Sequence, residues 1–474
     1  MDPKGNGSNM PLMSQSRLVA RDLAVLWHPC SQMTDYRDFP PLEVVSASGC
    51  RIKLADGREI LDAVSSWWCK SLGHGHPDIS AAIRAQLDRF EHVILANTTS
   101  ELVVSFCERL LTAANAGFTQ QPRTTNREPR TFSKVFFAEN GSTAVEVALK
   151  MALHAQALWG HPQRTHFAAL SGGYHGETVG ALSVGDLGLY ADPYRPLLFP
   201  SLQLGPLPWR SGPEDPRWLD ASAEWPAIVH QLQTQANKLA AIIYEPILQG
   251  AGGMRVVSPD LLTRLRAWAD AHDVLLIADE IAAGMGRCGA ILASHLATNA
   301  RPDIAVVGKG LTGGTLPLAC TLTTQRIYDT FLGTWAEKRA FLHSNTFAGN
   351  ALAVAAANAV LTVFERDRIY ERATETGKRM RLALADLART RPWIANVRGV
   401  GMMAACDLRR RDGSPLDPAA RTGFQVYREA VRRGALLRPL GDTMYVMPPL
   451  NTGWGDIERM LVILADSTDS IVSH

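Results

Sequence analysis

Short apolar runs alternate with longer amphipathic stretches through the middle of the chain. The apolar runs have the length and the β-branched or alanine-rich composition of buried strands, and they span residues 134–138, 166–170, 239–245, 274–279, 304–307 and 318–323. A helical stretch follows the first run at 141–159, and Ser258 and Pro259 cap another that ends at His272. This alternation predicts an α/β fold in which helices cover a mostly parallel sheet.

The pattern changes after Phe364, where charge density rises. Residues 366–389 form an arginine-rich amphipathic stretch that predicts a helix, and short strands are expected near 397–407 and 444–447. Near the other end, an Asp56–Gly57 turn between two alternating runs predicts a hairpin over 44–62 that packs with the C-terminal part.

We therefore expect a large domain over 65–365 and a smaller α+β domain built from both ends, 1–64 and 366–474. The polar and proline-rich segments 119–131 and 204–226 are predicted to be surface loops.

Composition excludes several classes of protein. The chain has 474 residues, of which 46% are hydrophobic and 20% charged, as in ordinary globular proteins. A formal net charge of +2 gives no electrostatic footprint for nucleic acid or an acidic membrane, so neither partner is expected. The seven cysteines are an odd number without a Cys-x-x-Cys pair, which argues against disulfides and a metal site. With a polar N-terminus that lacks the apolar core of a signal peptide, this favours a cytoplasmic location.

Two residues at the ends of apolar runs carry the most chemical information. Asp279 ends the run Val-Leu-Leu-Ile-Ala, and Lys309 follows Ile-Ala-Val-Val-Gly. An amine and a carboxylate at one sheet edge are what pyridoxal phosphate needs, because the lysine can form the Schiff base while the aspartate keeps the pyridine nitrogen protonated. Taken singly, Lys309 is better explained as a solvated loop residue, and Asp279 is equally well a helix cap or part of a structural ion pair.

Three more motifs lie directly after predicted strands. Gly141 and Ser142 begin a helix, whose free N–H groups suit a phosphate, although simple capping explains them too. Tyr174 could stack on a pyridine ring or merely pack. Glu245 could order neighbouring groups of the site or could equally be structural.

Adjacent tryptophans and a distant arginine are candidate substrate contacts. Trp67 and Trp68 are expected to point to opposite sides of an extended segment, and large aromatic side chains offer area to an aliphatic ligand or to the core. Arg438 has the planar fork that binds a carboxylate in a bidentate manner, with a surface ion pair as the alternative.

Together these motifs resemble the class III (subgroup II) aminotransferases, a fold-type I family that depends on pyridoxal phosphate. The resemblance runs from residue 26 to residue 449 and includes Asp279–Glu280, Gly308–Gly310 and Thr346. It implies a homodimer with shared active sites. Lys309 would bind the cofactor and move protons, and Asp279 would pair with the pyridine nitrogen. Gly141 and Ser142, with Asn345 and Thr346 across the dimer interface, would hold the phosphate.

More specific motifs are similar to the branch of this family that serves biotin synthesis; they are Ser65–Trp68, 245–254, 311–315 and Arg438–Pro439. This similarity implies transamination of 8-amino-7-oxononanoate to 7,8-diaminononanoate, with S-adenosylmethionine as the amino donor. Under that reading the substrate contacts are Trp67, Trp68, Tyr174 and Ser344, with Arg438 on the distal carboxylate.

One departure leaves the donor open. The family often has tyrosine, associated with substrate recognition, where this chain has Cys30. Cys30 has neither its reach nor its phenolic hydroxyl, so lysine stays an alternative donor. Another ω-aminotransferase, acting on ornithine, 4-aminobutyrate or a diamine, is the alternative enzyme, although Trp67 and Trp68 argue for a long aliphatic substrate. A related transcription regulator is disfavoured, because no helix-turn-helix pattern precedes Trp27.

Overall fold

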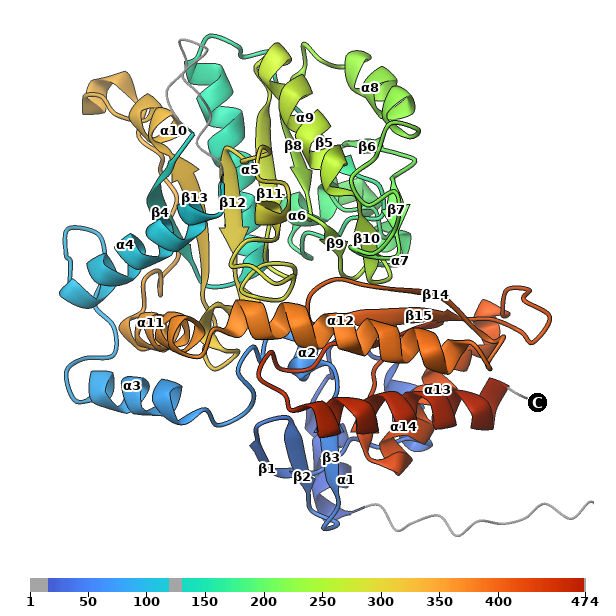
Figure 1. Cartoon of the computed structure of the whole chain (residues 1–474). Helices are drawn as coiled ribbons and strands as arrows, with labels where there is room; N and C mark the ends of the chain where they lie inside the picture. The colour runs from blue at the N-terminus through green and yellow to red at the C-terminus, as the bar shows by residue number, and fades with distance from the viewer. Residues whose placement is uncertain (1–15, 119–129, 473–474) are drawn as a thin grey trace, which may run out of the picture.

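A seven-stranded sheet forms the centre of the protein. The computed structural model describes residues 16–118 and 130–472, so the predicted loop at 119–131 lies almost wholly outside the described residues. In spatial order the sheet contains β4 (Phe132–Ala138), β13 (Ala319–Thr324), β12 (Ile304–Val307), β11 (Leu275–Asp279), β8 (Leu239–Tyr244), β5 (His166–Leu170) and β6 (Leu202–Leu204). These strands occupy the upper half of Figure 1.

The sheet is mostly parallel, as predicted. Strands β12, β11, β8, β5 and β6 pair in parallel, whereas β13 runs antiparallel to both β12 and β4. The predicted strand at 318–323 therefore exists but has the opposite direction. Every residue of β13 is buried, and a strand buried on both faces is apolar whichever way it runs. The hydrophobic pattern therefore could not predict the direction of this strand.

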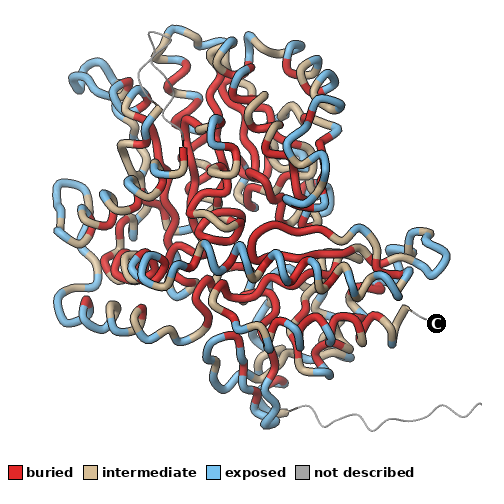
Figure 2. The backbone as a smooth tube through the Cα atoms, viewed as in Figure 1, coloured by how far each residue is buried: buried red, intermediate tan, exposed pale blue. Residues whose placement is uncertain are grey.

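Helices cover both faces of this sheet. Along β8, Ala241 and Ile243 pack on the side of α5 (Gly141–Leu158), while Ile242 and Tyr244 pack on the side of α9 (Pro259–His272). Successive residues of a strand face opposite sides, so a strand covered twice must be apolar throughout. Figure 2 shows the resulting core as a buried centre with exposed helices and loops around it.

The remaining helices frame the sheet or form the lower half of Figure 1. Besides the short α2 (Ser65–Trp68), they are α1 (Arg17–Val25), α3 (Pro77–Leu87), α4 (Glu101–Ala116), α6 (Val179–Ser183), α7 (Gly188–Ala191), α8 (Trp225–Gln233), α10 (Gln325–Thr330), α11 (Ala351–Arg366), α12 (Ile369–Ala388), α13 (Thr422–Arg433) and α14 (Trp454–Val472). The predicted helix at 366–389 corresponds to α12. No helix within the described ranges combines the length and apolar character needed to cross a membrane.

The two ends of the chain share a sheet. Strands β1 (Val44–Ser48), β2 (Arg51–Leu54) and β3 (Glu59–Asp62) are antiparallel neighbours, and β16 (Ala435–Leu436) pairs with β3. The predicted hairpin is thus two successive hairpins, and it packs with the C-terminal part as expected. A second antiparallel sheet contains β14 (Ile394–Gly399), β15 (Ala404–Leu408) and β17 (Thr443–Val446).

Segment 204–226 is more than a surface loop, contrary to the prediction. It contains β7 (Trp209–Arg210), which pairs with β10 (Arg255–Val257), and β10 in turn pairs with β9 (Leu248–Gln249). Leu207 and Ala221 are buried. The proline- and glycine-rich composition hid this short strand because prolines normally mark irregular backbone.

Candidate active site

The carboxyl ends of two neighbouring strands bring Asp279 and Lys309 together. Strand β11 ends at Asp279, which is in register with Val306 of β12, and Lys309 lies three residues beyond Val306. Residues at the carboxyl ends of parallel strands line one edge of the sheet, where open α/β folds bind ligands. Lys309 has a φ of 44°, a left-handed conformation that is uncommon for a side-chain-bearing residue.

Asp279 is held by a buried histidine. Its Oδ2 lies 2.8 Å from Nδ1 of His175, and its Oδ1 accepts a hydrogen bond from the N–H of Ile281. Both side chains are almost fully buried. The Nε2 of His175 is also buried and has no hydrogen-bond partner among the described residues.

The side chain of Lys309 is buried and lines a cleft. Burial lowers the pKa of its amine below the ordinary value, and the carboxylates of Asp279 and Glu245 oppose that effect. The Nζ lies 5.1 Å from the centre of the Trp68 ring. Desolvation makes the neutral amine, the form that can act as a nucleophile or base, more accessible near neutral pH.

Glu245 orders the backbone of this edge. Its two oxygens accept hydrogen bonds from the N–H groups of Tyr174 and Gly250, at 3.0 and 2.9 Å. Burial raises the pKa of this carboxyl to about 7. Of the two readings left open by the sequence, the contacts favour ordering: the side chain links the end of β8 to the segment after β5.

The side chain of Tyr174 lines the wall of a cleft. Its hydroxyl donates to Oε1 of Glu177 at 2.9 Å, and its ring meets that of Tyr190 edge to face. Cys30 approaches the same carboxylate, with Sγ 3.9 Å from Oε1 of Glu177. Burial raises the pKa of the Cys30 thiol, so the group is a thiol rather than a thiolate at neutral pH.

A cleft of about 770 Å³ joins most of the candidate residues. The candidates from the sequence that line it are Cys30, Trp67, Trp68, Tyr174, Lys309 and Arg438. Its walls come from the segment after β3, the segment after β5 and the C-terminal strands. A cavity of this size accommodates a ligand of small-molecule dimensions.

The tryptophan pair does not lie in an extended segment, contrary to the prediction. Residues Ser65–Trp68 (α2) all have positive φ, between 45° and 71°. Such a left-handed turn is costly for residues other than glycine, so propensity gave no sign of it. Trp68 is buried and donates through Nε1 to the hydroxyl of Tyr445 at 3.0 Å, whereas Trp67 is 43% exposed at the cleft.

Arg438 lies against the exposed tryptophan. Its guanidinium carbon is 4.6 Å from the centre of the Trp67 ring, and its Nη2 donates to the carbonyl oxygen of Cys30 at 2.8 Å. It takes part in no ion pair within the described parts of the chain, so the surface ion pair considered as its alternative is not formed there. The guanidinium therefore retains hydrogen-bonding capacity for an anionic ligand.

The start of α5 fits a phosphate. Asn140 caps the helix by accepting from the N–H of Thr143, and the other N–H groups of a first helical turn have no intrahelical partner. The Ser142 hydroxyl accepts a hydrogen bond from the N–H of Glu177. This close approach of Ser142 to the segment after β5 requires glycine at position 176, since a Cβ on Gly176 would collide with the Ser142 side chain.

Residues 344–346 are apart from this cleft. None of Ser344, Asn345 and Thr346 lines it, and the Oδ1 of Asn345 is buried with no hydrogen-bond partner among the described residues. Their neighbour Phe347 donates its N–H to Glu139, close to the start of α5 in the sequence. One chain therefore does not bring these three residues into the cavity.

The structure adds residues that sequence reasoning did not assign. His175 contacts Asp279, Glu177 contacts Tyr174, and Tyr445 contacts Trp68. The signal for His175 was its position directly after Tyr174 beyond an apolar run. Glu177 had no signal of its own. Among the described residues, no group of three or more potential ligands could hold a metal ion.

Taken together, these groups fit pyridoxal phosphate. They supply a desolvated amine at Lys309, a buried carboxylate at Asp279, and a helix start at Gly141 that suits an anion. The buried Nε2 of His175, whose ring contacts Asp279, has no hydrogen-bond partner among the described residues and is free to bind a ligand.

Comparison with known proteins agrees with this chemistry. The family model described as aminotransferase class III matches residues 33–467. The adenosylmethionine-8-amino-7-oxononanoate aminotransferase of Nitratidesulfovibrio vulgaris is 38% identical over 97% of this chain and 83% of its own length. The structure of the enzyme of that name from Methanocaldococcus jannaschii has a TM-score of 0.86 at 31% identity, covering 96% of this chain and 99% of that one.

A third similar protein is an amine transaminase from an uncultivated Pseudomonas species, whose structure contains pyridoxal phosphate. It has a TM-score of 0.83 at 32% identity, covering 94% of this chain and 99% of that one. The fold is accordingly that of the fold-type I transferases. With a family match over most of its length and a lysine and an aspartate at the edge of its central sheet, the chain belongs to the class III aminotransferases.

Proposed function

We propose that this enzyme converts 8-amino-7-oxononanoate to 7,8-diaminononanoate in biotin synthesis, with pyridoxal phosphate as cofactor and S-adenosylmethionine as amino donor. The observation that carries the proposal is the single cleft shared by Lys309, Trp67 and Arg438. It offers an amine, an apolar wall and a carboxylate-binding fork to one elongated molecule. The two relatives named for this reaction, from N. vulgaris and M. jannaschii, support the choice of substrate.

Lys309 is the residue that attaches the cofactor and moves protons. When bound, pyridoxal phosphate supplies an electron sink that stabilises negative charge at the adjacent substrate carbon. The amine of Lys309 would take the proton from that carbon and pass it to the carbon of the cofactor to which the lysine had been attached. Because burial lowers the pKa of this amine, more of it is in the neutral, proton-accepting form.

Asp279 and the start of α5 hold the two ends of the cofactor. The carboxylate of Asp279 stabilises a proton on the pyridine nitrogen, and His175 fixes the orientation of that carboxylate. Gly141 and Ser142 bind the phosphate. Tyr174, whose backbone is held by Glu245, packs beside the ring and the substrate.

The outer part of the cleft selects the acceptor. Arg438 binds the distal carboxylate, and Trp67 covers the aliphatic chain between that carboxylate and the reacting carbon. Ser344 reaches the substrate across a dimer interface. Cys30, which lies at the rim beside Arg438 and Glu177, is close to where a donor enters.

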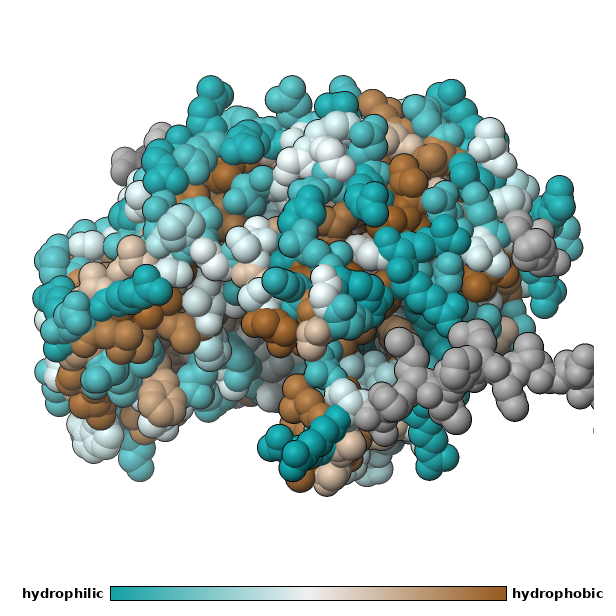
Figure 3. Space-filling view, turned by 90° about the horizontal axis from the view of Figure 1, so that it is seen from below, coloured by the Kyte–Doolittle hydropathy of each residue, from teal (hydrophilic) through white to brown (hydrophobic). Residues whose placement is uncertain are grey.

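A homodimer with shared sites is part of the proposal. Asn345 and Thr346 complete the phosphate site of the other subunit, since within their own chain they do not line the cleft that contains Lys309. Large hydrophobic residues are exposed near these segments, among them Val93, Ile94, Val104, Leu342 and Phe347. Figure 3 shows hydrophobic residues gathered at the left of the underside, where Figure 1 places α3 and α4.

The cellular setting and the domain division belong to the same proposal. A cytoplasmic location is supported by the seven cysteines, all of which are free. The division into 1–64, 65–365 and 366–474 is supported by the pairing of β3 with β16, which joins the two outer segments.

Half-reactions identify the donor. S-adenosylmethionine and lysine, each added alone to the enzyme with bound cofactor, are compared by the loss of the cofactor's visible absorbance. We expect S-adenosylmethionine to abolish this absorbance. If lysine abolishes the absorbance and S-adenosylmethionine does not, lysine is the donor, and the proposed acceptor is unaffected.

An amine transaminase is the second candidate, because a protein of that name is 32% identical and shares the fold. Steady-state turnover separates the two functions: 8-amino-7-oxononanoate is the expected acceptor, and its carboxylate would engage Arg438. Preference for 4-aminobutyrate as donor with no turnover of 8-amino-7-oxononanoate would favour the second candidate.

A further inference from the structure

We propose that Asp62, together with His74, is a positioning residue that holds the left-handed Ser65–Trp68 turn and thereby sets the selectivity of the cleft for long acceptors. This inference rests on the proposed function for the identity of the acceptor. Its structural part, that Asp62 fixes the conformation of Trp67, stands independently of any substrate.

Asp62 is the hydrogen-bond centre of the turn. Its side chain is fully buried at the end of β3. Oδ1 accepts from the N–H groups of Val64 and Ser66, at 3.3 and 3.0 Å, and Oδ2 accepts from the hydroxyl of Ser66 at 2.7 Å. Both oxygens thus bind residue 66, the second residue of the left-handed turn. Although burial alone raises it, hydrogen bonds from His74 and Ser66 bring the pKa of this carboxyl below its ordinary value.

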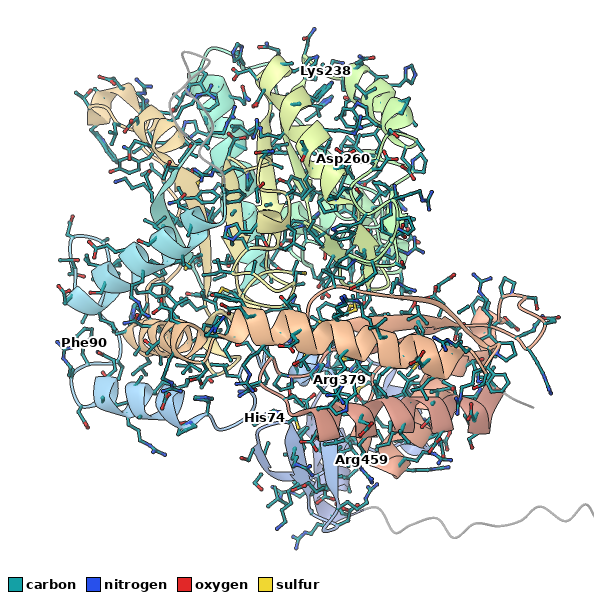
Figure 4. The ribbon with its side chains drawn as sticks, viewed as in Figure 1. His74, Phe90, Lys238, Asp260, Arg379 and Arg459 are labelled. Carbon is teal, nitrogen blue, oxygen red and sulfur yellow. The ribbon has the colours of Figure 1, made fainter. Side chains whose placement is uncertain are left out.

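His74 completes this clamp and is itself fixed. Its Nε2 lies 2.8 Å from Oδ2 of Asp62 and 3.3 Å from the hydroxyl of Ser66. Its backbone forms a two-hydrogen-bond bridge with Gly49 in the turn between β1 and β2. Figure 4 labels His74 near the upper end of this small sheet. Gly73 makes the bridge possible, because a Cβ there would lie 2.8 Å from the Gly49 carbonyl oxygen.

The turn needs such a clamp because its conformation is unfavourable. Four successive residues with side chains have positive φ, whereas left-handed residues normally occur singly. Strained backbone persists only where the surroundings over-determine it. The opposite side of the turn is tied to other elements: the Ser65 hydroxyl donates to the Met447 carbonyl oxygen, and Arg287 donates to that hydroxyl at 3.4 Å.

Loss of the Asp62 clamp affects one wall of the cleft and leaves the reacting end in place. Trp67 follows Ser66 directly and carries Arg438 against its ring. Lys309 and Asp279 are fixed by β12 and β11, which make no hydrogen bond with Asp62. Trp68, the turn residue whose ring faces Nζ of Lys309, is held separately by its hydrogen bond to Tyr445. A relaxed turn therefore displaces Trp67, in the wall that covers a long substrate, more than it disturbs the cofactor site.

The test follows Trp67 directly. The contribution of Trp67 to the near-ultraviolet circular dichroism is obtained as the difference between the holoenzyme and its Trp67→Phe variant, in the wild-type and Asp62→Ala backgrounds. We expect Asp62→Ala to abolish most of this contribution while the absorbance of bound pyridoxal phosphate is retained. An unchanged Trp67 contribution would overturn the proposal, whatever the substrate of the enzyme.

Kinetics test the selectivity. We expect Asp62→Ala to raise the KM for 8-amino-7-oxononanoate about tenfold with a smaller change in kcat, because misplaced binding groups weaken productive binding. A fall in kcat as large as the rise in KM would contradict a positioning role. If wild-type enzyme fails to turn over this acceptor, the proposed function fails, and the dichroism result still decides the role of Asp62.

Two further variants separate positioning from general destabilisation. Ser66→Gly in the Asp62→Ala background should restore much of the Trp67 signal and KM, because glycine adopts positive φ without strain. Absence of any rescue would mean that the turn's conformation is not what Asp62 controls. Asp303→Asn is the matched control: this buried carboxyl accepts from Arg266 and Leu276 at the amino end of β12, opposite the cleft. It should lower stability without changing the Trp67 signal.

Discussion

His175 and Asp279 form a buried pair, with Nδ1 of the histidine 2.8 Å from Oδ2 of the aspartate. The histidine comes from the segment after β5 and the aspartate from the end of β11, so the pair ties two parts of the sheet edge together. An acid that must face a cofactor needs its other oxygen fixed, and a packed ring does this better than water.

Removing His175 should therefore impair catalysis without preventing cofactor binding. We expect His175→Ala to reduce kcat/KM about 10- to 100-fold, equivalent to about 1–3 kcal/mol, the usual effect of leaving a buried charged partner unsatisfied. Steady-state kinetics on cofactor-saturated enzyme measure it. His295→Ala, which removes another largely buried histidine outside the cleft, should leave kcat/KM within about twofold. Equal effects of both variants would contradict an orienting role for His175.

Lys309→Ala should abolish covalent attachment of the cofactor. The visible absorbance of the attached form should be missing, and kcat should fall about 10²- to 10⁴-fold or more, since the general base is lost as well. Absorbance spectra and single-turnover kinetics measure the two effects. Lys134→Ala, at a lysine in β4 that lies over the Tyr328 ring, is the control and should keep both. Persistence of the absorbance in the first variant would rule out Lys309 as the attachment point.

Stability should fall as pH rises through the range in which Glu280 titrates. Burial raises the pKa of this carboxyl to about 7, against 4.5 for the free side chain, while hydrogen bonds from Ser294 and Ala293 oppose the shift. The folded state therefore binds the proton more tightly than the unfolded state. Its stabilising effect is complete below about pH 4.5 and is lost by about pH 7, a change of up to about 3 kcal/mol.

Denaturant unfolding between pH 4.5 and 8 measures this dependence. Glu280→Gln should reduce the slope, because the amide does not titrate, while Glu245, whose pKa burial also raises to about 7, keeps contributing. The exposed Glu375→Gln should leave the slope unchanged. A slope that Glu280→Gln does not alter would assign the pH dependence to other groups.

Arg438→Lys should weaken binding of the carboxylate-bearing acceptor. Lysine keeps the charge but lacks the planar fork and the contact of the guanidinium with Trp67. We expect KM to rise about tenfold with kcat changed less than about threefold. Progress curves with 8-amino-7-oxononanoate test this, and Arg428→Lys in α13, where the guanidinium lies over the Phe39 ring, serves as control. A fall in kcat alone would place Arg438 in the chemistry and not in binding.

The alternation of apolar runs and helices predicted most of the central sheet. Strands β5, β8, β11 and β12 lie where they were expected, because doubly covered strands must be continuously apolar. The direction of β13 was not predictable from that property. The pairing of β9 with β10 and of β7 with β10 depends on a segment whose composition is typical of loops.

The site was predictable where residues end strands and was not where distant segments fix the backbone. Asp279 and Lys309 met at one edge because parallel strands end together. The left-handed turn at Trp67 was not predictable from propensity, because Arg287 and Met447, far away in the sequence, hold it together with the nearby Asp62. His175 carried no sequence feature that distinguished orientation from packing.

The sharing of one sheet by the two ends of the chain has a consequence for synthesis on the ribosome. The N–H of Leu61 donates to the carbonyl of Gly434, and Ala63 accepts from the N–H of Met447. The strand that leads into the Trp67 turn can pair with β2 early, but it lacks its C-terminal partners until residue 447 has been translated. Strands β8, β11 and β12 can pair much earlier. Contacts of such long sequence separation form late. The wall proposed to select the substrate is accordingly the last part of the site that a single chain can assemble.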